Sequence, residues 1–167
     1  MTDGHFILYQ TTGIACPYLP ARVSRMDFFE SQKMPENLYE TLLSHGFRRS
    51  GEIFYRNVCP GCQECRAIRI PVSLFQPSRS QRRAVRKNVD VRVTLVRTEF
   101  RADVFALFQR YSLFKHGKKE SMKNFRDFLC SSPLDSRMTL YHSGDSLIAA
   151  GWVDVLPGGL SSVYFAF

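Results

Sequence analysis

The 167-residue sequence lacks any long hydrophobic run. No stretch approaches the roughly 18 to 20 consecutive apolar residues that a membrane-spanning helix needs. Residues 1–10 also lack the basic start and long apolar centre of a secretory signal peptide. We therefore expect a cytoplasmic protein that has no membrane partner.

Cysteine is scarce: the chain has five, which is an odd number. A disulfide framework needs paired cysteines in an exported protein, so these five point to metal binding, catalysis or core packing. Hydrophobic residues make up 44% and charged residues 23%, which excludes a disordered or fibrous chain. The length suits one good-sized domain or two small ones.

Acidic residues are outnumbered, with 15 Asp and Glu against 23 Lys and Arg, for a formal net charge of +8. The imbalance is local, because residues 66–119 hold 14 Lys and Arg but only 3 Asp and Glu. Concentrated positive charge suits a polyphosphate partner, since the release of condensed counterions drives such binding. A solvated basic face without a partner is the alternative.

Apolar periodicity in the first half predicts a helix followed by short strands. The helix covers residues 34–45, and a strand around residues 53–56 leads into a cluster of cysteines. Alternation over residues 67–72 predicts another strand, which Pro71 would place at a sheet edge. The polar stretch 76–90 is the candidate domain boundary.

The second half predicts a strand, two helices and three further strands, over residues 91–95, 102–115, 122–129, 137–142, 146–155 and 160–167. Gly-containing turn sequences separate the last three, which indicates an antiparallel meander. We therefore expect an α+β protein with a cysteine-rich N-terminal unit over residues 1–88 and an acetyltransferase-like unit over residues 89–167. The latter stops on an apolar strand with an uncovered edge, so we expect it to be C-terminally truncated.

The cysteine cluster has the form C-x2-C-x2-C, made by Cys59, Cys62 and Cys65. Such short loops let several thiolates converge on one metal centre, and Cys16 is the natural fourth ligand. Zinc and a [4Fe–4S] cluster both fit these ligands. A structural metal would stabilise a small unit by on the order of 10 kcal/mol. Cys130 lies on the apolar face of a predicted helix, where it is expected to pack in the core.

A short arginine-rich helix is predicted after Ser78, whose side chain can cap its first turn. Arg79, Arg82, Arg83 and Arg86 follow at helical spacing, so their guanidinium groups share one face. Like charges at that spacing repel one another, and the helix therefore favours an anion lying against it.

Two functions fit these features. One is a metal-stapled RNA-binding module without catalysis. The other is an acyl-transfer enzyme whose donor is an aminoacyl-tRNA, and this second reading uses both halves of the chain. The sequence has no glycine-rich phosphate cradle of the Q/R-x-x-G-x-G/A type, so we do not expect coenzyme A to be the donor.

Several motifs occur together in a recognisable order: Thr11 to Pro20, Gly46 to Gly51, Tyr55-Arg56 ahead of the cysteines, Arg69 to Val72 and Pro77 to Arg83. With these motifs the sequence resembles the arginyl-tRNA–protein transferases, and specifically their bacterial branch, the aspartate/glutamate leucyltransferases. The resemblance covers nearly the whole chain and is most specific from Gly46 to Arg83.

The resemblance implies transfer of leucine from leucyl-tRNA to the N-terminal amine of proteins that start with Asp or Glu, which marks them for the N-degron pathway. Arginyl transfer from arginyl-tRNA is the alternative within the family. The reaction is the aminolysis of an ester, which depends on orienting two substrates and stabilising an oxyanion. We see no Ser/His/Asp arrangement and assign no catalytic residue. The family normally continues several tens of residues further, and the sequence does not indicate an oligomeric state.

The resemblance also implies roles for individual residues. The metal ligands, for an iron–sulfur cluster or zinc, would be Cys16, Cys59, Cys62 and Cys65. The acidic end of the acceptor would be read by Arg48, Arg49, Arg56 and Arg69. The tRNA would be held by Arg79, Arg82, Arg83, Arg86, Lys87, Lys115 and His116. In the segment Tyr111 to His116, which resembles a Tyr-x3-Arg-His motif of the family, Lys115 replaces the Arg and lacks its bidentate fork.

Overall fold

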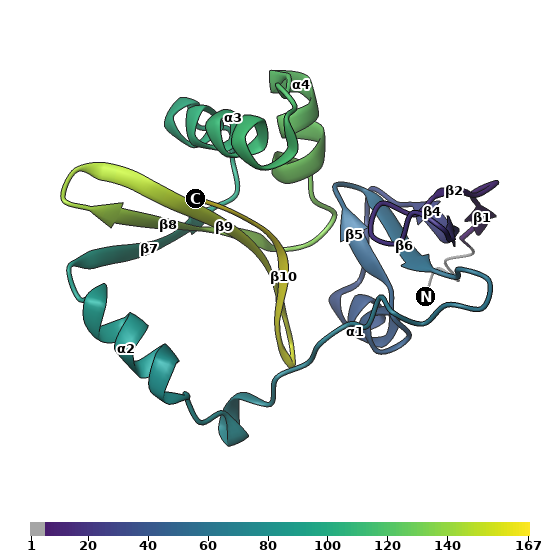
Figure 1. The fold of residues 1–167 in the computed structure, drawn as a ribbon, viewed down its shortest axis with the longest axis horizontal. Helices are drawn as coiled ribbons and strands as arrows, with labels where there is room; N and C mark the ends of the chain where they lie inside the picture. Colours follow the sequence, from purple (N-terminus) through teal and green to yellow (C-terminus); the bar gives the residue numbers. More distant parts are fainter. Residues whose placement is uncertain (1–5) are drawn as a thin grey trace.

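The structure, a computed structural model, describes residues 6–167. It contains two antiparallel four-stranded sheets joined by a long connector (Figure 1). We call residues 6–62 the N-terminal lobe and residues 91–167 the C-terminal lobe. This arrangement confirms the expected α+β class. No helix in the described part of the chain is long and apolar enough to cross a membrane.

The N-terminal lobe is built on a sheet of strand order β1-β4-β6-β5. Its elements are β1 (Tyr9–Gln10), β2 (Ile14–Ala15), β3 (Val23–Ser24), β4 (Met26–Glu30), α1 (Glu36–Ser44), β5 (Arg48–Ser50) and β6 (Ile53–Asn57), with β2 and β3 forming a separate hairpin. Helix α1 agrees with the predicted one and buries Tyr39 edge-on against Phe54 at 5.3 Å between ring centroids. Phe29 stacks on the same Phe54 ring at 5.2 Å, which forms the core of this lobe.

The C-terminal lobe has strand order β10-β9-β8-β7, with every neighbouring pair antiparallel. Its elements are β7 (Val91–Arg97), α3 (Ala102–His116), α4 (Met122–Phe125), the π-helical turn Arg126–Cys130, β8 (Ser136–Ser143), β9 (Ser146–Leu156) and β10 (Gly159–Ala166). This order confirms the predicted meander. Helices α3 and α4 lie on one side of the sheet (Figure 1) and bury Val104, Phe108 and Phe125 against Trp152.

Residues 63–90 form the connector, and every one of them is exposed to solvent. It contains one 3-10 turn (Val72–Leu74) and helix α2 (Arg79–Lys87), which begins as predicted at Ser78. The strand predicted over residues 67–72 is wrong. Ile68 is 83% exposed, and no described strand pairs with this segment. Its alternating apolar side chains therefore have no sheet or core to pack against. The predicted domain limit falls at Asn88, the C-cap of α2.

The two lobes are packed directly against each other. Leu156, at the end of β9, is buried in the core of the N-terminal lobe. The Ser131 hydroxyl donates to the Glu52 carboxylate at 2.7 Å, and the Gly158 amide donates to Glu40 at 2.8 Å. Gly51 has a φ of +59°, and a Cβ there would overlap the Asp127 carbonyl oxygen, so only glycine fits this close approach.

Candidate functional site

The junction between the lobes places β5 beside β10, each an edge strand of its own sheet (Figure 1). The half-buried Arg48 extends from β5, and its guanidinium donates to the carbonyl oxygen of Ser162 on β10 at 3.4 Å. Ser162 precedes a register shift in the pairing of β10 with β9. Within residues 6–167, Arg48 forms no salt bridge with a carboxylate. Its positive charge is therefore uncompensated at the junction.

Arg49 points the opposite way and is buried. Its guanidinium forms a bidentate ion pair with Asp154 at 2.5 and 2.6 Å, and both side chains are at most 1% exposed. It also donates to the Ser136 hydroxyl and to the Gly51 carbonyl, each at 3.1 Å. The prediction that Arg49 reads the acceptor does not fit this geometry, because its charge is already neutralised in the lobe interface. Arg49 instead fastens β5 to β8 and β9.

The two other predicted acceptor-binding arginines lie elsewhere. Arg56 pairs with Asp27 at 3.0 Å and covers the Phe47 ring at 5.0 Å, so its charge is already partnered. The Gln10 amide hydrogen bond, more than the Arg56 contact, lowers the pKa of Asp27 below its ordinary value. Arg69 is exposed on the connector and makes no side-chain hydrogen bond to any described residue. Arg48 is thus the only one of the four placed unpaired at the lobe junction.

Two tyrosines of the N-terminal lobe lie near Arg48 and differ in exposure. Tyr55 is its register partner on β6, and burial raises the pKa of Tyr55. Burial, and then the charge of Asp154, raise the pKa of Tyr39 to about 12. Only Tyr55 is partly exposed and can contact a ligand, because Tyr39 is 1% exposed and packs in the core of the N-terminal lobe. The sequence did not indicate Asp154 as the partner of Arg49, because no short-range pattern shows which strand of the other lobe faces β5.

Helix α2 presents the predicted basic surface: Arg79, Arg82, Arg83, Arg86 and Lys87 are all exposed. The helix contains no acidic residue, and none of these cations forms a salt bridge with any residue in 6–167. A capping box holds its first turn, in which Ser78 and Gln81 exchange side-chain to backbone hydrogen bonds. We call this surface the α2 basic face.

Lys115 and His116 lie at the end of α3, on the other side of the sheet from α2 (Figure 1). The hydroxyl of Tyr164 lies 3.5 Å from His116 Nε2, and burial is the main cause of the raised pKa of Tyr164. The seven residues predicted to hold tRNA thus form two separate groups. The α2 group holds five of the seven residues, and the α3 group holds Lys115 and His116.

The cysteines form no disulfide in the described chain. Arg22 donates to the Gly61 carbonyl oxygen at 2.8 Å, and the Arg25 amide donates to Cys59 Sγ at 3.4 Å. These bonds join the β2–β3 hairpin, which carries Cys16, to the turn between Cys59 and Cys62. Within residues 6–167, no three His, Cys, Asp or Glu side chains converge as metal ligands do. Thiol side chains are suitable ligands for zinc or an iron–sulfur cluster.

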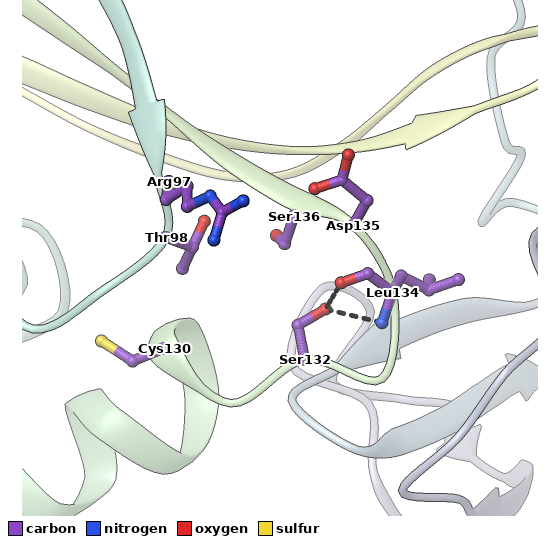
Figure 2. A pocket seen from close by; sticks show the side chains of 7 residues that line it. All are labelled: Arg97, Thr98, Cys130, Ser132, Leu134, Asp135 and Ser136. Carbon is purple, nitrogen blue, oxygen red and sulfur yellow. Dashed lines mark hydrogen bonds between the residues drawn. The ribbon is translucent and has the colours of Figure 1, made fainter.

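A polar cavity of about 330 Å³ lies where the C-terminal lobe approaches the N-terminal lobe (Figure 2). Its lining residues are Arg97, Thr98, Cys130, Ser132, Leu134, Asp135 and Ser136. Ser136 connects the cavity to the buried pair, since its hydroxyl accepts from Arg49. Burial raises the pKa of the Cys130 thiol, which packs against the lobe's core as expected. The Thr98 hydroxyl is buried there and has no hydrogen-bond partner in the described structure.

Comparison with known sequences assigns both halves of the chain to one family. Residues 14–83 match "Arginine-tRNA-protein transferase, N terminus", and residues 103–167 match "Arginine-tRNA-protein transferase, C terminus". An aspartate/glutamate leucyltransferase of Pseudomonas savastanoi pv. phaseolicola is 38% identical over 93% of this chain and 68% of its own length. Proteins of the same name from Thiobacillus denitrificans and Saccharophagus degradans are 32% identical (95% of this chain, 68% of theirs) and 35% identical (100% and 74%). The chain therefore belongs to the arginine-tRNA-protein transferase family.

Proposed function

We propose that this protein transfers leucine from leucyl-tRNA to the N-terminal amine of proteins that begin with Asp or Glu. The observation that carries the proposal is the similarity, over more than nine-tenths of the chain, to proteins named aspartate/glutamate leucyltransferase. Those names favour leucine over arginine as the transferred residue. Two uncompensated basic features, Arg48 and the α2 basic face, supply the charges that an acidic acceptor and a tRNA donor require.

The reaction needs little covalent participation by the protein. The neutral α-amine of the acceptor attacks the ester carbonyl carbon of leucyl-tRNA, and a C–N bond forms. The ester C–O bond breaks, and the terminal ribose oxygen leaves with the proton that the amine gives up. Holding the amine and ester in contact supplies much of the rate enhancement, because orientation replaces a bimolecular encounter.

Arg48 is the proposed acceptor-reading residue. A guanidinium binds a carboxylate through two parallel N–H bonds, and Arg48 carries the unpaired guanidinium at the lobe junction. Its present contact is a single, long bond to the Ser162 carbonyl oxygen, which an acceptor carboxylate can replace. Selection of Asp or Glu over Ala then follows from an ion pair that a neutral side chain cannot form.

The α2 basic face is the proposed contact for the tRNA backbone. Exposed arginines at helical spacing match successive phosphates, and the mutual repulsion of these arginines falls when phosphates lie against them. We also propose that the C-terminal lobe, whose order is strand, two helices and three strands, is an acetyltransferase-like catalytic unit.

We further propose that Cys16, Cys59, Cys62 and Cys65 bind zinc or an iron–sulfur cluster. The support is the thiol donor set and the hydrogen bonds that join the hairpin to the turn. Absorbance near 400 nm in anaerobically purified protein would identify a cluster, and one zinc per colourless chain would identify zinc. Cys59→Ser should lower the metal content while Cys130→Ser leaves it unchanged. Metal-free wild-type protein of normal fold would contradict the site.

The transfer itself can be tested with radiolabelled leucyl-tRNA and short peptides. We expect label in peptides that start with Asp or Glu, and none in a matched peptide that starts with Ala. Arg48→Gln should reduce transfer to the acidic peptides, with part of the activity regained in Arg48→Lys. Absence of transfer with leucyl-tRNA and arginyl-tRNA alike would reject the proposal. Equal affinity for charged and uncharged tRNA would then favour the RNA-binding module.

A further inference from the structure

The face of the N-terminal sheet that looks away from its core carries a row of aromatic side chains that ends at Arg48. In antiparallel strands, register partners share a face. Arg48 pairs with Tyr55, Tyr55 pairs with Phe28, and Phe28 pairs with Tyr9. The row therefore crosses four strands, β5, β6, β4 and β1. We call Tyr55, Phe28 and Tyr9 the aromatic row.

Burial separates this face from the core face. Phe29 and Phe54, the neighbours of Phe28 and Tyr55 along their strands, are at most 3% exposed. Phe28 and Tyr55 are only partly buried, and Tyr9 is 53% exposed. The Tyr9 and Phe28 rings contact each other at 5.6 Å between centroids, so these two residues form a shared aromatic surface at the end of the row away from Arg48.

The charges on this face fit a polypeptide better than RNA. Arg48 is the only cation in register with the aromatic row, and Glu30 lies exposed on the same face of β4. A nucleic-acid strand needs several cations along its path, and a carboxylate beside it repels the phosphates. A peptide needs one cation for an acidic first residue and an apolar, aromatic surface for the residues that follow.

We propose that the aromatic row is the binding surface for the first residues of the acceptor protein, with the acidic N-terminal side chain on Arg48. This proposal rests on the proposed function and adds to it a site for the rest of the acceptor. Three strand spacings of about 4.8 Å separate Arg48 from Tyr9, a span of about 14 Å. An extended chain advances about 3.3 Å per residue, so the fifth residue reaches Tyr9.

Measuring peptide binding in the absence of tRNA tests the proposed role of the aromatic row directly. Fluorescence anisotropy with labelled peptides that start with Asp should show affinity rising with length up to about five residues and then levelling off. Tyr9→Ala should weaken binding of the pentapeptide by about fivefold or more, as loss of an interface aromatic does. It should leave the Asp-headed dipeptide unaffected. Phe28→Leu, which keeps an apolar side chain but removes the aromatic ring, should also weaken pentapeptide binding and provides a second test.

Phe114→Ala is the matched control, because Phe114 is 90% exposed on α3 in the other lobe. The proposal would be overturned if wild type, Tyr9→Ala and Phe28→Leu bound the pentapeptide with equal affinity. It would also be overturned if affinity did not depend on peptide length. Weaker binding of tRNA alone to the Tyr9 and Phe28 variants would also overturn it, by assigning the row to RNA. Length-dependent peptide binding without any leucine or arginine transfer would instead reject the proposed function and still support peptide binding by the aromatic row.

Discussion

Arg48 and Arg49 are chemically identical neighbours on β5, and strand alternation sends them to opposite faces of the sheet. Arg49 enters the interface between the lobes and is satisfied there by Asp154, Ser136 and the Gly51 carbonyl. Arg48 reaches the β10 edge with its charge free of any described carboxylate. The register of one short strand thus decides which arginine is structural and which can bind a ligand.

Removing one partner of the buried pair should strongly destabilise the fold. Asp154→Ala leaves the Arg49 guanidinium charged and enclosed, which we expect to lower the free energy of unfolding by about 3 to 5 kcal/mol. Urea unfolding followed by circular dichroism measures this loss. Asp127→Ala, which removes an exposed pair with Lys123, should cost less than about 1 kcal/mol. A similar cost for both variants would show that the pair contributes nothing special.

Asp27 should make stability depend on pH at the acidic end. Its pKa is lowered from the ordinary 3.8, mainly by the Gln10 hydrogen bond and then by Arg56. The folded state therefore binds this proton less readily than the unfolded state does. The resulting stabilisation is present above pH 3.8 and is lost as the pH falls through the lower folded pKa. The unfolding free energies of wild type and Asp27→Asn should converge over that range, and a constant difference would contradict the assignment.

At the scale of elements, α2 is a helix with no tertiary packing. Each of its residues is exposed, so its stability depends on local interactions alone. The capping box at Ser78 and Gln81 supplies one of them, while the repulsion among its arginines opposes it. A helix of this kind is ordered most firmly when an anionic ligand lies against it.

Ser78→Ala should therefore unfold α2 more readily without affecting either lobe. Loss of a capping side chain costs about 1 kcal/mol, which is a large share of the stability of a nine-residue isolated helix. Amide hydrogen exchange should become faster in α2 alone, and tRNA binding should weaken. Ser73→Ala, in the exposed 3-10 turn, is the matched control. Unchanged exchange in α2 would contradict the role of the cap.

Apolar periodicity predicts some elements of this protein correctly and one of them wrongly. Helix α1 and the strands of the meander have periodic apolar residues that pack into a core, and the predictions for these elements are confirmed. The segment 67–72 has an equally regular alternation and forms no strand. Because a strand depends on a neighbour for its hydrogen bonds, alternation alone does not specify one. Sequence supplied no information on whether a neighbour was available.

At the scale of the whole molecule, the exposed cations of α2 lie apart from the packed cores of the two lobes. The basic residues of α2 stand on the connector, outside both cores, whereas the buried ion pair lies in the lobe interface. Electrostatic association with a polyanion therefore need not disturb the packing that positions Arg48. We expect nucleic-acid binding and folding stability to respond independently to salt and to mutation.

Salt should weaken tRNA binding steeply. If about four phosphates contact the α2 basic face, log K should fall with log salt by a slope of about −3 to −4. Replacing Arg79, Arg82, Arg83 and Arg86 by Gln should bring the slope most of the way to zero. Lys115→Gln alone should change it by about one unit or less. Affinity measured by anisotropy between low and moderate salt gives the slopes, and a wild-type slope near zero would remove the tRNA assignment of α2.

The sequence by itself determined the α+β class, the order of most elements, the cap of α2 and the concentration of charge in residues 66–119. Periodicity, turn residues and charge are local properties, so they can be read without knowing what lies nearby. The tertiary structure decided that Arg49 is buried while Arg48 is free, and that Tyr9, Phe28 and Tyr55 align with Arg48. The alignment of the row depends on strand register, and the burial of Arg49 depends on the docking of two lobes, which joins residues 105 positions apart.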